Sequence, residues 1–347
     1  MIVVFTLCSS NYLAHAKVLG DSLTENNPDH RFVIGLVDRV PEELEPSYWH
    51  PYELIPVEEL DVPEFGEMVR DHNVVELNTA VKPFYLEHLY RRNPEVEAVI
   101  YLDPDILVTG SFQSLTDKLR THDIVVTPHS CTFDDSDTNL YYEGGMLTGG
   151  IYNLGFIATA RRATTFSFLK WWQKRLQNCC HFRQGRGGFV DQLWVALAPL
   201  YFPNVYVEKD PGYNICYWNH FERQLTRRNG RYLVNDKHDV VFYHFSSYNP
   251  MKPELIAGRP GAKIMSFSER PDLKPLYDDY RQRLFSKGYP KIRALKYSLG
   301  KKPPKSKLTI KRAAKRSLRA LLKAMPVNVQ TRLKSLAQFT ADNCLDG

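Results

Sequence analysis

Short apolar runs alternate along the chain with longer segments in which apolar residues recur at helical spacing. Runs of this length that are dominated by apolar residues are typical of strands buried on both faces. The strands expected from this pattern span residues 2–8, 32–37, 99–102, 106–108, 124–127, 151–158 and 240–243. The helical spacing predicts helices over residues 12–26, 79–92 and 164–178. Alternation of strands and helices predicts an α/β fold with a mostly parallel sheet flanked by helices.

Two aspartates separated by one proline follow the predicted strand over residues 99–102. Asp103 and Asp105 therefore stand at the carboxyl end of a buried strand, where ligands bind in open α/β sheets. Two carboxylates so close repel each other, and a cation between them relieves that repulsion. Their hard oxygens suit Mg²⁺ or Mn²⁺, which keep positions open for water and a substrate phosphate. The alternative is a pair of solvated turn residues, because Asp and Pro both favour turns.

The bulk composition is that of a soluble globular protein. Hydrophobic residues make up 43% and charged residues 24% of the 347-residue chain, enough to bury a large core. The six cysteines show no framework spacing, which favours reduced thiols and a cytoplasmic location. Residues 2–8 lack a basic leader and a long apolar region, so they are expected to form a strand and not a signal peptide. No run reaches the roughly 18 apolar residues that a transmembrane helix needs.

Positive charge is concentrated at the end of the chain. Residues 301–347 hold 12 Lys and Arg against two acidic residues, so residues 1–300 carry a small excess of acids. We expect a body over residues 1–300 and a basic helical tail over 301–347, with a linker over 301–305. Pro326 ends an amphipathic helix whose apolar face is formed by Ile310, Ala314, Leu318, Leu321, Leu322 and Met325.

A basic amphipathic helix is typical of proteins that bind an anionic membrane surface. The tail therefore predicts peripheral attachment to the inner face of the cytoplasmic membrane. The alternative is a helix that packs on the body with its basic face in water. Nucleic acid is not an expected partner, because aromatic residues are not interleaved with the charges of the tail.

Three further polar motifs follow the aspartate pair in order. Asn153 and Gly155 lie in a predicted strand, Asp191 and Gln192 come next, and Tyr243-His244-Phe245 precedes Lys252-Pro253. In this order the motifs resemble glycosyltransferases of the GT-A fold, specifically the family 8-like bacterial enzymes of polysaccharide and lipopolysaccharide synthesis. The resemblance covers about residues 1–255. The chain departs from the family in the longer spacing from the histidine to the lysine and in Glu254, where the family has a tryptophan.

The resemblance implies a GT-A sheet with a Rossmann-like nucleotide-binding half and a metal-dependent transfer of sugar. Asp103, Asp105 and His244 would bind Mn²⁺ or Mg²⁺. The donor would be a nucleotide diphosphate sugar, most simply a uridine diphosphate sugar, and the acceptor a glycan or a lipid-linked glycan. Retention of configuration is also implied, with Gln192 near the anomeric carbon as a stabiliser or weak nucleophile and Asp191 bound to sugar hydroxyls.

The same resemblance assigns donor-binding roles to residues along the chain. They are Thr6, Asn11, Tyr12, Asp38, Lys82, Asp103, Asn153 and Lys252. Tyr12 would stack on the base, Asp38 would approach the base or ribose, and Lys82 would pair with phosphate at a helix start.

Each of these assignments has a plainer alternative. His244 could be a core histidine at a strand end, and Lys82 a solvated surface lysine. Asp191 would also be favourable as the first residue of a helix without binding any ligand. Ser9, Ser10 or Asn11 could cap the first helix.

Residues 133–150 are rich in Asp, Tyr and Gly, and we expect them to form a mobile surface loop. If the reaction inverts configuration instead, it needs a carboxylate base near the acceptor. The candidates in or beside this segment are Asp134, Asp135, Asp137 and Glu143.

Two other functions fit parts of the pattern. A haloacid dehalogenase-type phosphatase would use Asp103 as a covalent nucleophile. Its motif usually opens the chain, whereas here about 100 residues precede it, and Leu107 stands where such enzymes have Thr or Val. A non-catalytic protein that binds nucleotide sugars would keep the fold and the same residues.

Overall fold

The computed structural model of the chain describes residues 1–133, 137–183, 188–258 and 266–301. The predicted tail helix lies outside the described residues, as do Asp134 and Asp135, so the division at residue 300 stays a prediction. Within the described ranges, no helix is long and apolar enough to cross a membrane.

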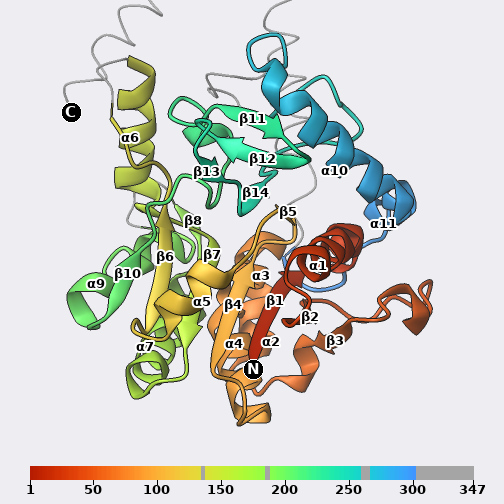
Figure 1. Cartoon of the computed structure of the whole chain (residues 1–347). Helices are drawn as coiled ribbons and strands as arrows, with labels where there is room; N and C mark the ends of the chain where they lie inside the picture. Colours follow the sequence, from red (N-terminus) through yellow and green to blue (C-terminus); the bar gives the residue numbers. More distant parts are fainter. Residues whose placement is uncertain (134–136, 184–187, 259–265, 302–347) are drawn as a thin grey trace, which may run out of the picture. The chain divides into compact units, whose positions relative to one another are not determined.

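The core of the fold is a seven-stranded sheet in the order β10-β6-β7-β4-β1-β2-β3 (Figure 1). Its strands are β1 (Ile2–Cys8), β2 (Arg31–Leu36), β3 (Glu53–Pro56), β4 (Ala98–Leu102), β6 (Ile124–Pro128), β7 (Tyr152–Ala160) and β10 (Val205–Val207). Strand β7 is antiparallel to β4 and β6, and the other pairs are parallel. The predicted α/β class with a mostly parallel, helix-flanked sheet is therefore confirmed.

Both faces of this sheet are covered by helices, which explains why its strands are apolar throughout. Along β4, Ile100 and Leu102 point into a core shared with helices α1 (Leu13–Asn26) and α5 (Gln113–Leu119). The alternate residues Val99 and Tyr101 enter a second core with helices α4 (Lys82–Arg92) and α7 (Ala163–Cys179). This packing brings the end of β4 to one edge of a rigid layer.

A smaller part of the fold follows the sheet along the chain. Strand β14 (Phe242–His244) pairs antiparallel with β5 (Ile106–Val108), and His244 stands opposite Ile106. Helices α10 (Lys274–Ser286) and α11 (Tyr289–Arg293) lie against α1, as Figure 1 shows in blue beside red. The remaining elements are α2 (Phe65–Asp71), α3 (Val74–Ala80), α6 (Asp137–Gly149), α8 (Gln192–Val195), α9 (Ala198–Tyr201), β8 (Phe182–Arg183), β9 (Gly188–Phe189), β11 (Leu225–Arg228), β12 (Arg231–Val234) and β13 (His238–Asp239).

The single helix predicted over residues 79–92 is wrong at its beginning. Helix α3 ends at Ala80 and a separate helix, α4, begins at Lys82. Pro83 lies in the first turn of α4, where its missing N–H costs nothing and its fixed φ favours a helix start. Lys82 is thereby placed at the beginning of α4, as the sequence predicted.

The loop predicted over residues 133–150 is also wrong, because residues 137–149 form helix α6. Two of the glycines that indicated a loop, Gly144 and Gly145, lie within this helix, and Gly149 and Gly150 stand at its end. Gly150 has a φ of +108°, and its N–H donates to the carbonyl oxygen of Met146 at 2.9 Å. A Cβ at this position would lie 2.7 Å from the backbone carbon of Gln192, so only glycine fits this helix end.

Candidate active site

Three side chains converge at the carboxyl end of β4. Asp103 and Asp105 follow that strand, and the pairing of β14 with β5 brings His244 beside them. The Nε2 atom of His244 lies 3.2 Å from Asp105 Oδ1 and 3.6 Å from Asp103 Oδ2. One ligand atom from each residue lies within 4.8 Å of the other two, so the three residues form a group that could hold a metal ion.

The charges of this group stabilise one another. Burial by itself would lower the pKa of His244, but the neighbouring Asp105 and Asp103 carboxylates raise it above its usual value. Burial by itself would raise the pKa of Asp105, but His244 beside it lowers that pKa overall. Without a cation, the two carboxylates therefore favour the protonated form of the His244 imidazole. A divalent cation would balance their charge instead and displace this proton.

Contacts with neighbouring strands hold Asp103 and His244 in this arrangement. Asp103 Oδ1 accepts a hydrogen bond from the Tyr101 hydroxyl at 2.6 Å. The imidazole of His244 packs so close to β7 that a Cβ at Gly155 would lie 2.5 Å from its Cε1. Two carboxylates and an imidazole nitrogen suit Mn²⁺ or Mg²⁺, and the imidazole favours Mn²⁺. The residues present therefore fit a divalent cation.

A buried ion pair lies beside this group. Lys82 Nζ is 2.5 Å from Asp191 Oδ2, and the two side chains are only 4% and 3% exposed. The same ammonium donates to the carbonyl oxygen of Leu154 at 2.8 Å and lies 4.2 Å from the centre of the Tyr101 ring. Burial raises the pKa of Asp191 despite the opposing charge of Lys82. The alternative of a solvated surface lysine is therefore wrong for Lys82.

Gln192 and Asn153 are hydrogen-bonded to each other next to the ion pair. Gln192 Oε1 accepts from Asn153 Nδ2 at 3.2 Å and from the Leu154 N–H at 3.3 Å. Gln192 Nε2 donates to the carbonyl oxygen of Gly149 at 3.2 Å. Asp191 immediately precedes helix α8, but its side chain makes no capping hydrogen bond there. Its carboxylate instead pairs with Lys82.

The residues assigned to the base and ribose lie around the end of β1. Thr6 is fully buried on β1, and Asn11 and Tyr12 lie in a short 3₁₀ helix over Ser10–Tyr12. Tyr12 is 42% exposed, and its ring stacks on His15 with a centroid distance of 4.5 Å. Neither this 3₁₀ helix nor α1 has a side-chain cap, so the capping alternative for this loop is wrong.

Asp38 follows β2 and is only 1% exposed. Its Oδ2 accepts from the Ser10 hydroxyl at 2.7 Å, and its Oδ1 accepts from the Ser298 N–H at 2.8 Å. Both carboxylate oxygens are thus already bonded to the chain, and they join the loop after β1 to residues near the end of the body. A direct contact with the base or ribose stays a prediction for this residue.

Lys252 is exposed in a turn after β14, where its backbone N–H donates to the carbonyl oxygen of Asn249 at 2.8 Å. The structure adds two site residues that the sequence analysis missed. Tyr101 bonds Asp103, and Asn214 Oδ1 lies 3.1 Å from His244 Nδ1. Tyr101 lies two residues before Asp103, so its position next to the aspartate motif could have indicated it. Nothing in the sequence indicated Asn214, because its contact with His244 on β14 joins residues 30 positions apart.

No family model matches the chain. It is 26% identical to the uncharacterized protein YfnF of Bacillus subtilis (strain 168) over 287 residues, which cover 80% of this chain and 90% of YfnF. It is 23% identical to the uncharacterized protein YfnD of the same organism over 249 residues, 70% of this chain and 76% of YfnD.

Among solved structures, the chain is similar to the galactosyltransferase LgtC in complex with donor and acceptor sugar analogues. The identity is 17% and the TM-score 0.47, over 82% of this chain and 96% of that one. It is also similar to the glycosyltransferase GlyE of Streptococcus pneumoniae TIGR4, with 14% identity and a TM-score of 0.46, over 88% of this chain and 65% of that one. These likenesses assign neither a family nor an activity to the chain, so its function has to be argued from the site.

Proposed function

We propose that the chain is a metal-dependent glycosyltransferase that moves a sugar from a nucleotide diphosphate sugar to an acceptor hydroxyl. The observation that carries this proposal is the convergence of Asp103, Asp105 and His244 at the carboxyl end of β4. Next to them lie the side-chain amides of Asn153 and Gln192, and the hydrogen bonds of Gln192 within the described residues go to amide and carbonyl groups, not to a carboxylate. Residues that could hold a phosphate-binding cation, next to two side-chain amides, suit the transfer of a neutral sugar.

The chemistry assigns distinct tasks to these groups. A divalent cation, when bound, neutralises the negative charge that develops on the departing diphosphate. Asp103, Asp105 and His244 would hold this cation at the carboxyl end of β4, on the diphosphate side of the donor site. Asn153 and Asp191 bind the hydroxyls of the donor sugar. Lys82 holds Asp191 in place and adds positive charge near the phosphates.

We propose a retaining reaction, as the family resemblance implies. The amide of Gln192 has no basic group with which to activate an acceptor hydroxyl, so inversion would need a carboxylate base from elsewhere, such as Asp134, Asp135, Asp137 or Glu143. The Oε1 atom of Gln192 can stabilise positive charge at the anomeric carbon. The phosphatase alternative would need Asp103 as nucleophile, but Asp103 Oδ1 accepts from Tyr101 and its Oδ2 faces His244.

Calorimetric titration of the full chain with a panel of nucleotide sugars tests this function directly. We expect one uridine diphosphate sugar to bind tightly when Mn²⁺ is present and weakly without it, because a bound cation would offset the repulsion between the diphosphate and the two aspartates. The matched control is Asp105→Ala, which should lose the dependence on Mn²⁺. Failure of every nucleotide sugar to bind with metal would contradict the proposal, and hydrolysis of phosphate monoesters would favour the phosphatase.

We further propose that the tail over residues 301–347 attaches this cytoplasmic enzyme to an anionic membrane surface, where it meets a lipid-linked or lipopolysaccharide glycan acceptor. The support is the basic amphipathic pattern of the sequence.

Reversing charge on the basic face of the tail, with Arg312→Glu, Arg316→Glu and Arg319→Glu together, should release the chain from anionic vesicles. A basic residue near such a surface contributes about 1 kcal/mol, so vesicle affinity should fall by about a hundredfold or more. Co-sedimentation with anionic vesicles measures this, with neutral phosphatidylcholine vesicles as the control. Unchanged sedimentation of the triple variant would refute the attachment.

A further inference from the structure

We propose that Asn214 is a positioning residue that fixes the imidazole of His244 with its Nε2 lone pair toward Asp103 and Asp105. The inference rests on the proposed metal site. Asn214 Oδ1 lies 3.1 Å from His244 Nδ1, on the side of the ring opposite the aspartates. A hydrogen bond to the outer ring nitrogen is the usual way in which a protein orients a histidine ligand and selects its tautomer.

The direction of this hydrogen bond follows from an unambiguous donor elsewhere in the network. The backbone N–H of Gly155 donates to Asn153 Oδ1 at 3.1 Å, which identifies that atom as an oxygen. Asn214 Nδ2 lies 3.1 Å from the same oxygen, so this end of the Asn214 amide must be the donor. The other end is then an oxygen acceptor facing His244. The imidazole must therefore carry a proton on Nδ1, which leaves Nε2 free to bind a cation.

Asn214 is itself held firmly enough to impose this orientation. It is 1% exposed, and its φ of +52° is a left-handed conformation that asparagine tolerates better than most residues. Its Nδ2 also donates to the Thr127 hydroxyl at 2.9 Å, and its carbonyl oxygen accepts from Asn219 Nδ2 at 3.0 Å. The amide is thus fixed at both ends of the side chain and through its backbone.

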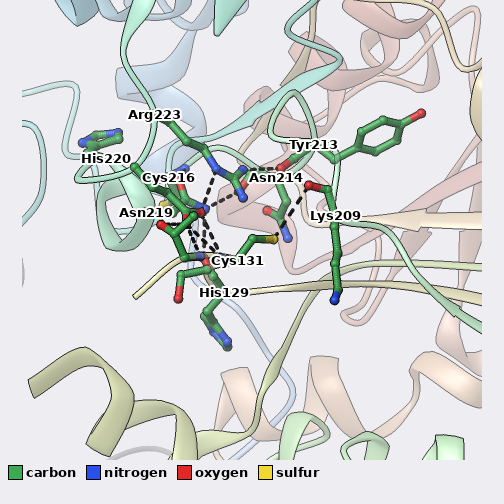
Figure 2. Close-up of polar contacts among 12 residues, drawn as sticks. His129, Cys131, Lys209, Tyr213, Asn214, Cys216, Asn219, His220 and Arg223 are labelled. Carbon is green, nitrogen blue, oxygen red and sulfur yellow. Dashed lines mark hydrogen bonds and ion pairs between the residues drawn. The ribbon is translucent and has the colours of Figure 1, made fainter. Parts of the chain in front are cut away.

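The segment that carries Asn214 is tied to its surroundings by several buried hydrogen bonds (Figure 2). Asn219 also donates to the carbonyl oxygen of His129 at 3.0 Å, and the Arg223 guanidinium donates to the carbonyl oxygen of Tyr213 at 2.6 Å. Arg223 is 2% exposed, so this arginine stiffens the chain one residue before Asn214. These hydrogen bonds therefore hold the backbone on both sides of Asn214, the residue that contacts His244.

The network also connects the metal group with the residues proposed to bind the sugar. Asn214 reaches Asn153, and Asn153 reaches Gln192. A single buried amide thereby contacts both the histidine ligand and the residue that holds Gln192. Loss of this amide should loosen both sides of the site together.

The test uses Asn214→Gly in the full chain, because glycine accepts the left-handed backbone and deletes only the side chain. Titration with Mn²⁺ alone, followed by electron paramagnetic resonance, should show binding weakened by about 10- to 100-fold. Spin-echo modulation from a coordinated imidazole nitrogen should weaken in the bound fraction. Asn214→Asp, which keeps an oxygen acceptor opposite Nδ1, should restore the nitrogen signal. Undiminished Mn²⁺ affinity and nitrogen modulation in Asn214→Gly would overturn the proposal.

Thr127→Val is the matched control, since it removes another hydrogen bond of the same amide without removing the acceptor for His244. It should leave the nitrogen modulation unchanged, and a loss equal to that of Asn214→Gly would point to packing alone and overturn the positioning role. The wild-type chain adds a test that needs no folded variant. In histidine ¹⁵N-labelled protein with bound Mg²⁺, His244 must carry its proton on Nδ1, and a proton on Nε2 overturns the inference.

These readouts separate the inference from the proposed function. Mn²⁺ bound through an Asn214-dependent imidazole, in a chain that binds no nucleotide sugar, would support the inference and refute the glycosyltransferase. A chain that binds nucleotide sugars with Mn²⁺ but keeps its nitrogen signal in Asn214→Gly would do the reverse. Failure of the wild-type chain to bind Mn²⁺ would overturn the inference.

Discussion

Replacement of Asp105 by asparagine should lower the rate of sugar transfer by about 10²–10³-fold, the loss expected when one preorganised electrostatic stabiliser is removed. The residue shares the metal group with Asp103 and His244, and its side chain is only 21% exposed. The amide keeps the shape of the carboxylate but removes the charge that attracts a divalent cation. Initial rates measured over a Mn²⁺ titration, with the donor identified by calorimetry, give the effect.

The matched control for this substitution is Asp278→Asn on helix α10. Asp278 is an exposed aspartate that pairs with Lys274 within its own helix, so its loss removes one negative charge from the surface without touching the site. Its rate and its response to Mn²⁺ should equal those of the unmodified chain. Full activity in Asp105→Asn, with unchanged Mn²⁺ dependence, would show that the two aspartates do not serve the reaction.

Lys82→Met should destabilise the fold by about 3–5 kcal/mol, the cost typical of leaving one member of a buried ion pair without its partner. Methionine fills a similar volume, but Asp191 would remain buried with no countercharge, and the carbonyl of Leu154 would lose its donor. Chemical unfolding of the full chain followed by circular dichroism measures the change. Activity should fall as well, because Asp191 would no longer be held beside the donor sugar.

A double substitution separates the charge from the packing. Lys82→Met combined with Asp191→Asn removes both charges, so most of the lost stability should return while activity stays low. The surface control is Lys274→Met, which breaks an exposed pair with Asp278 and should cost no more than about 0.5 kcal/mol. If Lys82→Met lowers the free energy of unfolding by less than about 1 kcal/mol, water reaches this ion pair and its burial contributes little to stability.

Local pattern was sufficient for the α/β class and for most strands of the sheet, but not for β3, β10 or the strand order. Strands buried on both faces are apolar at nearly every position, so β1, β4 and β6 could be recognised from their residues without any partner. Asp103 and Asp105 could be singled out for the same reason, because charges directly after such a run stand at the end of a buried strand. Helix α6 was misjudged because glycine content favours a loop, whereas here Gly144 and Gly145 lie within a helix and Gly149 and Gly150 end it.

The candidate site itself depends on contacts that no local pattern contains. Lys82 and Asp191 are separated by 109 positions, and their mutual burial decides that the lysine is not a surface residue. His244 meets the aspartates only because β14 pairs with β5 in one register. Asn214 reaches His244 across 30 positions from a left-handed backbone.

The sequence by itself thus determined the α/β class, most of the central strands and the types of residue that follow them. The tertiary structure decided which of them meet, which are buried and which atoms of each are already bonded. The physical reason is the separation along the chain over which each kind of interaction acts. Periodicity and turn chemistry act over a few residues, whereas an ion pair or an oriented imidazole needs atoms brought within about 3 Å by the packing of whole elements.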